Sequence, residues 1–248
     1  LLGITAASLL VRTFRWNFLL KADNIDLKFS DVGKPLMAGL AASLITPAKA
    51  GDLARCFLLR KEKGIHVKKS LPSLIFERLF DLAVLLSLAI ILLVSLKKTS
   101  FTLFVSIAIV LFVVLLLLLV FWFPPLSDFV FLKLLKNRFS EMEASAKKAP
   151  LSIYFYFAFL LSFAVWMLEF SRIYFILKFL GFFSMGFFQT AQILSVSLIA
   201  GVVSAIPGGL GSSELASIAL FSAFGVPSYI SSAALIIDRL VGFWPLIA

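Results

Sequence analysis

Cysteine and histidine are almost absent from this chain of 248 residues. Because Cys56 is the one cysteine, an intramolecular disulfide is excluded, and we expect its side chain to act as a small apolar packing group. The one histidine, His66, lies in a basic segment. Metal sites draw on clustered Cys, His or carboxylate ligands, so the sequence predicts no metal centre, and we expect no cofactor.

Charged residues are also scarce, at 15% of the chain against about 25% in typical soluble domains. Hydrophobic residues make up 61%, against roughly 45–50% in soluble domains. A soluble fold cannot bury this much apolar surface. The composition therefore predicts an integral membrane protein made almost wholly of transmembrane helices.

The clearest membrane-spanning segment is 101–123, an uncharged run of 23 residues. At about 1.5 Å per residue, a helix of this length crosses a bilayer core of about 30 Å. Other long apolar stretches lie at 1–20, 35–46, 74–96, 151–180, 187–206, 214–225 and 229–248. No stretch between them is long enough for a soluble catalytic domain. Since the chain begins and ends within apolar runs, without an initial Met, we expect a further terminal helix.

The formal net charge of +10 fits the topology of a membrane protein better than nucleic-acid binding. Basic residues gather between the apolar runs, above all in 60–69 and within 124–150. We expect both loops to face the cytoplasm, with the chain in the plasma membrane. We interpret these basic segments as solvated loops beside anionic lipid headgroups rather than as a dedicated docking patch.

An internal repeat is indicated when the chain is compared with itself. A shift of 160 pairs Arg12 with Arg172, Pro47 with Pro207 and Gly51 with Gly211, and a shift of 161 pairs Ser43 with Ser204 and Glu77-Arg78-Leu79 with Asp238-Arg239-Leu240. Such self-similarity is typical of transporters built from two related halves.

Each repeat unit contains two apolar pieces around a Pro-x-x-x-Gly break, such as 35–46 and 52–60, that are too short to span singly. We expect them to form a re-entrant hairpin, which is tolerated where protein or water covers the broken backbone. An odd number of crossings per unit favours an inverted repeat. Loop charge favours it too, because 21–34 and 60–69 hold eight Lys or Arg whereas the corresponding 181–189 and 225–232 hold none. A parallel repeat is the alternative, because 187–206 is long enough to span alone.

We therefore predict an all-α, polytopic transmembrane helical bundle with two internal repeats, in inverted orientation, and short re-entrant helices. It forms a single domain over 1–248, with repeat 1 at about 1–96, a connecting helix at 101–123, a cytoplasmic loop at 124–150 and repeat 2 at about 151–248.

Ionisable residues within the apolar segments are the candidate functional groups. Each costs about 2.5–3.5 kcal/mol on insertion scales, so such residues usually face a partner or a water-filled cavity. They form mixed-sign sets: Glu169 with Arg172 on one helix face, Glu77, Arg78 and Asp81 at the start of 74–96, and Asp238 with Arg239 in the matching place. Ion pairing between helices and a headgroup site are equally compatible with this pattern.

The glycine-rich segment 207–214 has a second interpretation beyond breaking a helix. Backbone N–H groups at Gly208, Gly209 and Gly211, with Ser212 or Ser213 as a helix cap, would offer partial positive charge to an anion such as a lipid phosphate. An ordinary glycine-rich turn is the commoner alternative, because Glu214 in the first helical turn satisfies the same dipole. The matching break at 47–51 adds Lys49 and Asp52, with Arg55 one turn later.

At these residues the chain resembles the lysylphosphatidylglycerol synthase transmembrane family, also called flippase-like membrane proteins. The matching motifs are Arg15-Trp16, Thr46-Pro47-x-x-x-Gly51-Asp52-x-x-Arg55, Glu77-Arg78-x-x-Asp81 and Pro207-Gly208-Gly209-Leu210-Gly211-Ser212-x-Glu214. The resemblance implies a plasma-membrane domain that, in aminoacyl-lipid synthases, moves the modified phospholipid between leaflets while a separate soluble domain performs the lysyl transfer. No such soluble domain is present in this sequence.

The leading hypothesis is a lipid flippase-like transporter whose partners are membrane lipids, anionic or lipid-linked. The expected headgroup-binding residues are Arg12, Arg55, Arg78, Arg172 and Arg239 with the glycine-rich segment, and the expected charge-balancing acids are Asp52, Glu77, Asp81, Glu169, Glu214 and Asp238. One alternative is a membrane-embedded transferase that uses Glu77, Asp81 or Glu214 as general base. Another is a scaffold for a separately encoded synthase.

Overall fold

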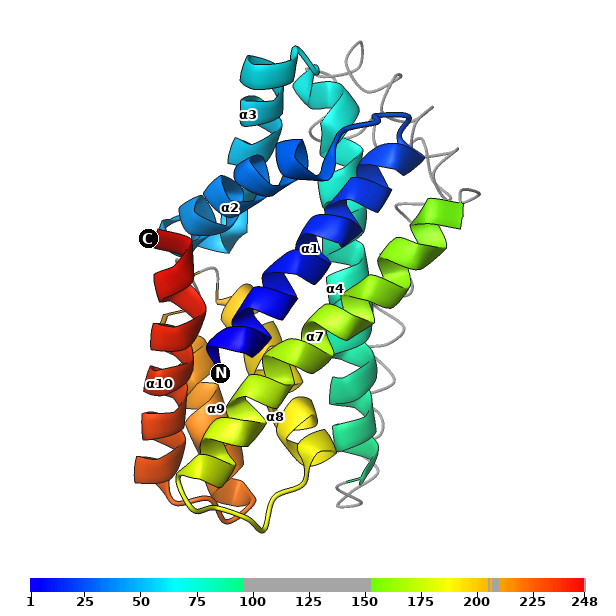
Figure 1. The fold of residues 1–248 in the computed structure, drawn as a ribbon. Helices are drawn as coiled ribbons and strands as arrows, with labels where there is room; N and C mark the ends of the chain where they lie inside the picture. The colour runs from blue at the N-terminus through cyan, green and yellow to red at the C-terminus, as the bar shows by residue number, and fades with distance from the viewer. Residues whose placement is uncertain (96–152, 205, 207–209, 248) are drawn as a thin grey trace.

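A computed structural model describes residues 1–95, 153–204, 206 and 210–247 of the protein. Within these residues the chain forms eight α-helices and one short 3-10 helix, and no β-strand (Figure 1). The expected spanning helix 101–123, the loop 124–150 and the glycines at 208 and 209 lie outside the described residues.

The first half of the chain runs from α1 to α4. Its elements are α1 (Leu2–Ala22), α2 (Phe29–Ile45), the 3-10 helix η1 (Pro47–Asp52), α3 (Leu53–Lys63) and α4 (Val67–Ser95). The second half begins after the undescribed segment and contains α7 (Ile153–Phe179), α8 (Phe187–Val203), α9 (Ser212–Ala223) and α10 (Ser228–Ile247). Both halves therefore place two shorter helices between two long ones.

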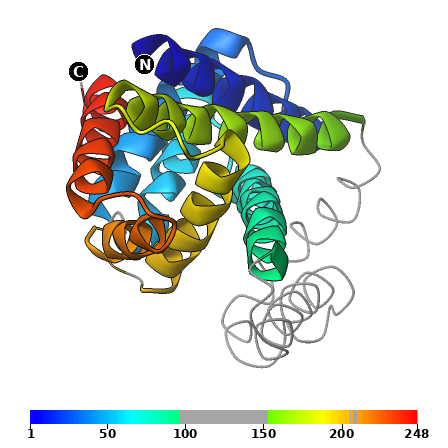
Figure 2. The same cartoon turned by 90° about the horizontal axis from the view of Figure 1, so that it is seen from below.

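Corresponding long helices of the two halves run in opposite directions. In Figure 1, α1 rises from the lower left and α7 descends beside it, while α4 runs downward and α10 runs upward. The view from below again places α1 alongside α7, and these two helices make extensive contact (Figure 2). The halves also meet where α4 packs on α8 and where α10 packs on α2.

Two helices start earlier than the hydropathy pattern predicts. The expected apolar segment 35–46 is part of α2, which begins at Phe29 with Asp31 in its first turn, where a carboxylate is favoured by the helix dipole. The Asp31 carboxylate also pairs with Lys63 Nζ of α3 at 2.9 Å. The expected segment 74–96 is part of α4, which begins at Val67. Hydropathy does not detect the polar first turns of α2 and α4, so the predicted starts of both helices are several residues too late.

The break between α2 and α3 depends on Gly51. A Cβ at this position would lie 2.2 Å from the carbonyl carbon of Ala42, so only glycine allows the two backbones to approach this closely. The Gly51 N–H donates to Thr46 Oγ1 at 2.7 Å, which satisfies a backbone donor where the helical pattern stops. The predicted break is therefore where the Pro-x-x-x-Gly spacing placed it.

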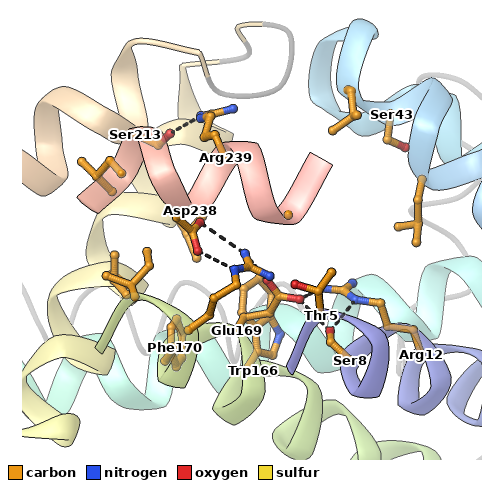
Figure 3. Close-up of a pocket in the computed structure, with 18 of the residues that line it drawn as sticks. Thr5, Ser8, Arg12, Ser43, Trp166, Glu169, Phe170, Ser213, Asp238 and Arg239 are labelled. Carbon is orange, nitrogen blue, oxygen red and sulfur yellow. Dashed lines mark hydrogen bonds and ion pairs between the residues drawn. The ribbon is translucent and has the colours of Figure 1, made fainter. Parts of the chain in front are cut away.

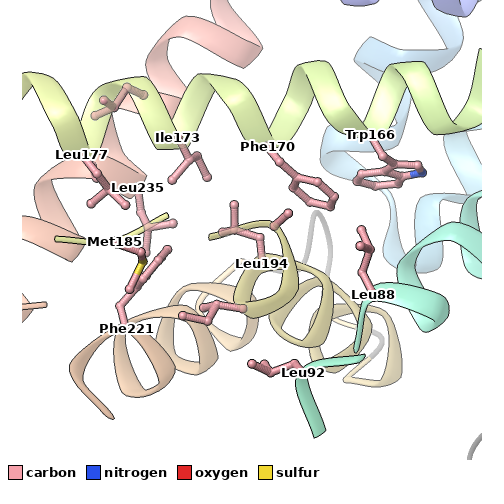
Figure 4. Close-up of a cluster of buried hydrophobic side chains, with 14 of the residues drawn as sticks. Leu88, Leu92, Trp166, Phe170, Ile173, Leu177, Met185, Leu194, Phe221 and Leu235 are labelled. Atoms are coloured by element: carbon pink, nitrogen blue, oxygen red, sulfur yellow. The ribbon is translucent and has the colours of Figure 1, made fainter. Parts of the chain in front are cut away.

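The largest apolar core lies under α7. Trp166, Phe170, Ile173 and Leu177 recur at helical spacing on one face of α7 and pack over Leu194 of α8 (Figure 4). Side chains from α4, α9 and α10 complete this cluster. A smaller cluster in the first half contains Trp16, Leu36, Leu59 and the buried thiol of Cys56.

Among the described helices, α7 alone combines the length and the apolar composition needed to cross a membrane, and Phe187–Val202 is a shorter apolar helix. The other long helices carry ionisable groups within their apolar stretches. In α1, for example, Arg15 is completely buried. Those groups define the candidate site.

Candidate functional site

A network of six charged side chains fills the interior of the first half. We call it the buried network, and it consists of Arg15 from α1, Asp52 from η1, Arg55 from α3, and Glu77, Arg78 and Asp81 from α4. Three arginines meet three carboxylates, so the formal charges cancel. Arg15, Arg55 and Glu77 are at most 1% exposed.

Glu77 is the centre of the buried network. Arg55 donates to both of its carboxylate oxygens, from Nη1 at 3.0 Å and from Nη2 at 3.1 Å. Arg15 Nη2 lies 2.8 Å from Glu77 Oε1, and Arg78 Nη2 donates to the same oxygen at 3.1 Å. Contact with three guanidinium groups offsets the desolvation cost of burying the Glu77 carboxylate. Removal of this carboxylate would leave buried positive charge without its partner.

Asp81 connects the buried network to the second half. Its Oδ1 accepts from Arg15 Nη1 at 2.6 Å and from Trp166 Nε1 of α7 at 2.9 Å. Arg15 Nη1 also donates to Ser162 Oγ of α7 at 3.1 Å. Part of the contact between α1, α4 and α7 is therefore polar and buried.

A second set of contacts joins α1, α7 and α10. We call it the bridging network, and it consists of Ser8, Arg12, Glu169, Arg172 and Asp238. Glu169 Oε1 accepts hydrogen bonds from Ser8 Oγ at 2.6 Å and from Arg12 Nη2 at 3.2 Å. Arg172 Nη2 lies 2.9 Å from Glu169 Oε2. Arg172 also donates to both oxygens of Asp238, from Nε at 2.5 Å and from Nη2 at 3.2 Å. Figure 3 shows this network along one wall of a cavity.

The start of α9 carries a third ionic contact. Arg239 of α10 pairs with Glu214 and donates from Nη2 to Ser213 Oγ at 3.3 Å. The Glu214 carboxylate accepts the Gly211 N–H at 2.8 Å, so this backbone donor already has an anionic partner within the protein. Gly211 is the N-cap residue, with φ at +87°.

The expectation that Ser212 or Ser213 caps α9 is wrong. Gly211 occupies the N-cap, and the Ser212 hydroxyl instead lies 2.7 Å from the hydroxyl of Ser204. The positive φ explains the difference, because glycine adopts this backbone conformation without the steric cost that serine would meet.

A cavity of about 250 Å³ lies where these ionic sets meet (Figure 3). Its charged lining consists of Arg12, Arg78, Arg172 and Arg239 with Asp52, Glu169, Glu214 and Asp238. Among the residues that the structure describes, four positive and four negative groups leave the lining formally neutral. Leucine, isoleucine and aromatic side chains complete the wall, including Leu40, Trp166 and Phe170.

The structure therefore brings together four of the five predicted arginines. Arg55 does not line the cavity, and neither do Glu77 and Asp81. These three side chains lie behind Asp52 and Arg78, within the buried network. Whether any of the lining residues binds a headgroup stays a prediction.

The sequence-based list of site residues missed Arg15, Ser8 and Trp166. Arg15 was visible as part of a family motif and as a charge inside an apolar helix, the same signal that selected Arg12. Ser8 and Trp166 gave no such signal, because serine and tryptophan are ordinary residues in membrane helices. Among the residues that the structure describes, no three His, Cys or carboxylate groups gather as a metal site would require.

Comparison with known proteins agrees with the motifs. The whole chain, residues 1–248, matches the family described as the lysylphosphatidylglycerol synthase TM region. A UPF0104 membrane protein of Pyrococcus horikoshii is 26% identical over 272 residues, covering 96% of this chain and 80% of that protein. One from Methanothermobacter thermautotrophicus is 26% identical over 260 residues, with 95% and 76% covered.

No solved structure matches the chain. The resemblance predicted from the separated motifs is confirmed by the match over the full length. The chain therefore belongs to the lysylphosphatidylglycerol synthase transmembrane-region family, and it is a membrane protein built of helices.

Proposed function

We propose that this protein binds the phosphate-bearing headgroup of a phospholipid or lipid-linked molecule and moves it between the two leaflets. The observation that carries the proposal is the cavity between the two halves, with four arginines and four carboxylates inside a bundle of apolar helices. Charged groups within a membrane are costly, and they commonly mark a substrate pathway. The family match supports a role in lipid metabolism.

The arrangement of the helices supports an inverted repeat. Corresponding helices are antiparallel, and one contact recurs in both halves at the shift of 161. Arg78 reaches Asp52 across 26 positions, and Arg239 reaches Ser213 across 26. We propose that each pair of short helices forms a re-entrant hairpin, one entering from each side of the membrane.

In this proposal the headgroup moves through the cavity while the acyl chains stay in the bilayer. The arginines replace part of the water that a phosphate would lose, and the carboxylates compensate the arginines when the cavity is empty. We propose the plasma membrane as the location, with the basic segment 60–69 and the loop 124–150 in the cytoplasm. The basic residues in the last turn of α3 support this orientation.

Transport accounts for the acids better than a general-base role does. Glu77 is 1% exposed and in contact with three arginines, so it does not reach a substrate in the cavity. Glu214 already pairs with Arg239 and accepts the Gly211 N–H. A transferase would leave a new lipid product, whereas a transporter leaves its substrate unchanged.

The test is reconstitution of the purified chain into vesicles that contain fluorescently labelled phosphatidylglycerol. Movement between leaflets is measured by chemical quenching of the outer leaflet, and products are examined by thin-layer chromatography. We expect translocation without a new product. R239E should reduce the translocation rate at least about tenfold, because it places two acids where Arg239 now pairs with Glu214.

R60E is the matched control, since Arg60 is exposed in the last turn of α3 and does not line the cavity. It should translocate lipid at the wild-type rate. The thermal unfolding midpoint of each variant in detergent establishes that it is folded. A folded R239E protein with wild-type translocation would contradict the proposal, and so would a new lipid product.

A further inference from the structure

Glu169 differs from the other described acids of the cavity because it contacts two arginines that both line the cavity. Its two oxygens meet donors from three side chains: the Ser8 hydroxyl at 2.6 Å, Arg12 Nη2 at 3.2 Å and Arg172 Nη2 at 2.9 Å. Ser8 and Arg12 belong to α1, whereas Arg172 belongs to α7. All of these residues line the cavity.

The other lining acids have different surroundings. Asp238 directs both of its oxygens to one guanidinium, that of Arg172. Asp52 meets Ser43 and two arginines, but one of the arginines, Arg55, does not line the cavity. Glu214 accepts from the Gly211 N–H and from Ser213 and pairs with one lining arginine, Arg239. Glu169 alone joins two lining arginines on different helices, as judged from the ion pairs of the described residues.

This geometry is that of an anion site with its anion already present. A carboxylate presents two oxygens to its donors, as a phosphate does, and guanidinium groups bind both in the same planar, charge-assisted manner. Figure 3 shows Glu169 between Asp238 on one side and Ser8 and Arg12 on the other, at the cavity wall. Arg12 and Glu169 are 15% and 21% exposed, so a solute in the cavity can reach them. Ser8 and Arg172 are 1% and 7% exposed, so a solute meets them only when the glutamate turns aside.

We infer that the Glu169 carboxylate occupies the phosphate position of the cavity and competes with the headgroup phosphate for Arg12, Arg172 and Ser8. The inference rests on the proposed function and deepens it by assigning the phosphate site and its internal competitor. A bound phosphate takes over the donors, and the flexible glutamate side chain turns aside.

The competitor has a physical purpose in a transporter. Without Glu169, Asp238 would be the one acid in direct contact with these two arginines among the described residues, and they would hold a phosphate so tightly that release would be slow. Translocation needs binding that is favourable enough for the headgroup to arrive and weak enough for it to leave. An acid that returns to the arginines as the phosphate departs lowers the affinity and keeps the empty cavity neutral.

The test compares E169Q with D238N. Both changes remove one negative charge from the same cavity, but only Glu169 lies between two lining arginines. Isothermal titration calorimetry on the detergent-solubilised chain would use two probes, dihexanoyl phosphatidylglycerol and inorganic phosphate. Since charge-assisted hydrogen bonds are stronger than neutral ones and the phosphate no longer competes with a carboxylate for them, E169Q should bind at least about tenfold more tightly than wild type. D238N should gain less than about threefold.

The two probes separate the sources of the phosphate. Tighter binding of the lipid identifies a lipid headgroup as the ligand, and a gain confined to inorganic phosphate identifies the free anion. Equal gains in E169Q and D238N would reduce the effect to net charge and overturn the inference. Unchanged or weaker binding by E169Q would overturn it as well.

E169D keeps the test available if E169Q does not fold. The shorter carboxylate retains its charge but cannot span Arg12 and Arg172 together, so it should also bind phosphate more tightly than wild type. R12Q combined with E169Q should lose most of the gain, because the phosphate then lacks one of its two guanidinium groups.

Failure of the proposed function gives a different result from failure of the inference. If wild-type vesicles do not translocate lipid while E169Q still gains affinity, the function is wrong and the phosphate site stands. If translocation occurs while E169Q shows no gain, the function stands and the role of Glu169 is wrong.

Discussion

The two halves of this protein use the same kinds of ion pair in different surroundings. In the first half, Arg15, Arg55, Glu77 and Asp81 are 0–6% exposed and compensate one another, while Arg78, which is 32% exposed, connects them to the cavity. In the second half, Glu169, Asp238, Arg239 and Glu214 are 17–23% exposed and face the cavity. The first arrangement is suited to holding helices together, and the second to exchanging partners.

The proposed repeat accounts for part of this difference. A shift of 161 places uncharged residues opposite four members of the buried network: Ile176 opposite Arg15, Ser213 opposite Asp52, Ala216 opposite Arg55 and Gly242 opposite Asp81. The space at Gly242 is filled by a guanidinium group: a Cβ there would lie 3.0 Å from Arg172 Nη2. The second half therefore has fewer fixed partners for its charges and more access to the cavity.

The largest expected effect tests the rigidity of the first half. E77Q leaves Arg15 and Arg55 without their shared carboxylate and should lower the free energy of unfolding by about 3–5 kcal/mol. D238N changes the counterpart position, where one arginine loses a partner beside the cavity, and should lower it by about 1–2 kcal/mol. Equilibrium unfolding in mixed detergent micelles measures both. Equal losses would remove the distinction between the halves.

The two breaks should also respond differently to alanine. G51A drives a methyl group into the backbone of Ala42 and should cost about 3 kcal/mol of unfolding free energy. At Gly211 a Cβ meets no atom within 4 Å, so G211A carries only the cost of the positive φ, about 1–2 kcal/mol. The same unfolding measurement applies. A G211A protein that is less stable than G51A would show that backbone strain outweighs packing here.

The smallest expected effect concerns the contact between the halves. W166F removes the hydrogen bond from Nε1 to Asp81 and should cost about 1.5 kcal/mol, because its acceptor is charged. W16F removes a hydrogen bond from Nε1 to the neutral Ser73 within the first half and should cost about 1 kcal/mol or less. Comparison of the two unfolding midpoints in one detergent gives the difference. A W16F protein less stable than W166F would contradict a special role for Asp81 between the halves.

Much of the helical pattern could be predicted from the sequence. The segment 151–180 and the helix Ile153–Phe179 agree within three residues at each end, because a long apolar run has few alternatives in a membrane. The start of α2 at Phe29 could not be read in this way. Its first turn is polar and is stabilised by Asp31 contacting Lys63, a tertiary contact that hydropathy does not register.

The candidate site was predicted residue by residue but not as a geometry. Spacing placed Arg172 opposite Arg12, but it did not show that the two arginines meet on one carboxylate, that of Glu169. Likewise, no pattern distinguished Arg55 behind the cavity wall from Arg78 at its surface.

The equal number of arginines and carboxylates among the described residues of the cavity has an electrical consequence for the proposed function. A neutral binding site adds no charge of its own, so a headgroup with one negative charge would carry that charge alone if it crossed here. At a membrane potential of 100 mV, negative inside, movement of this charge to the outer leaflet releases about 2.3 kcal/mol. Flipping of an anionic lipid through such a site is electrogenic, and its direction follows the membrane potential.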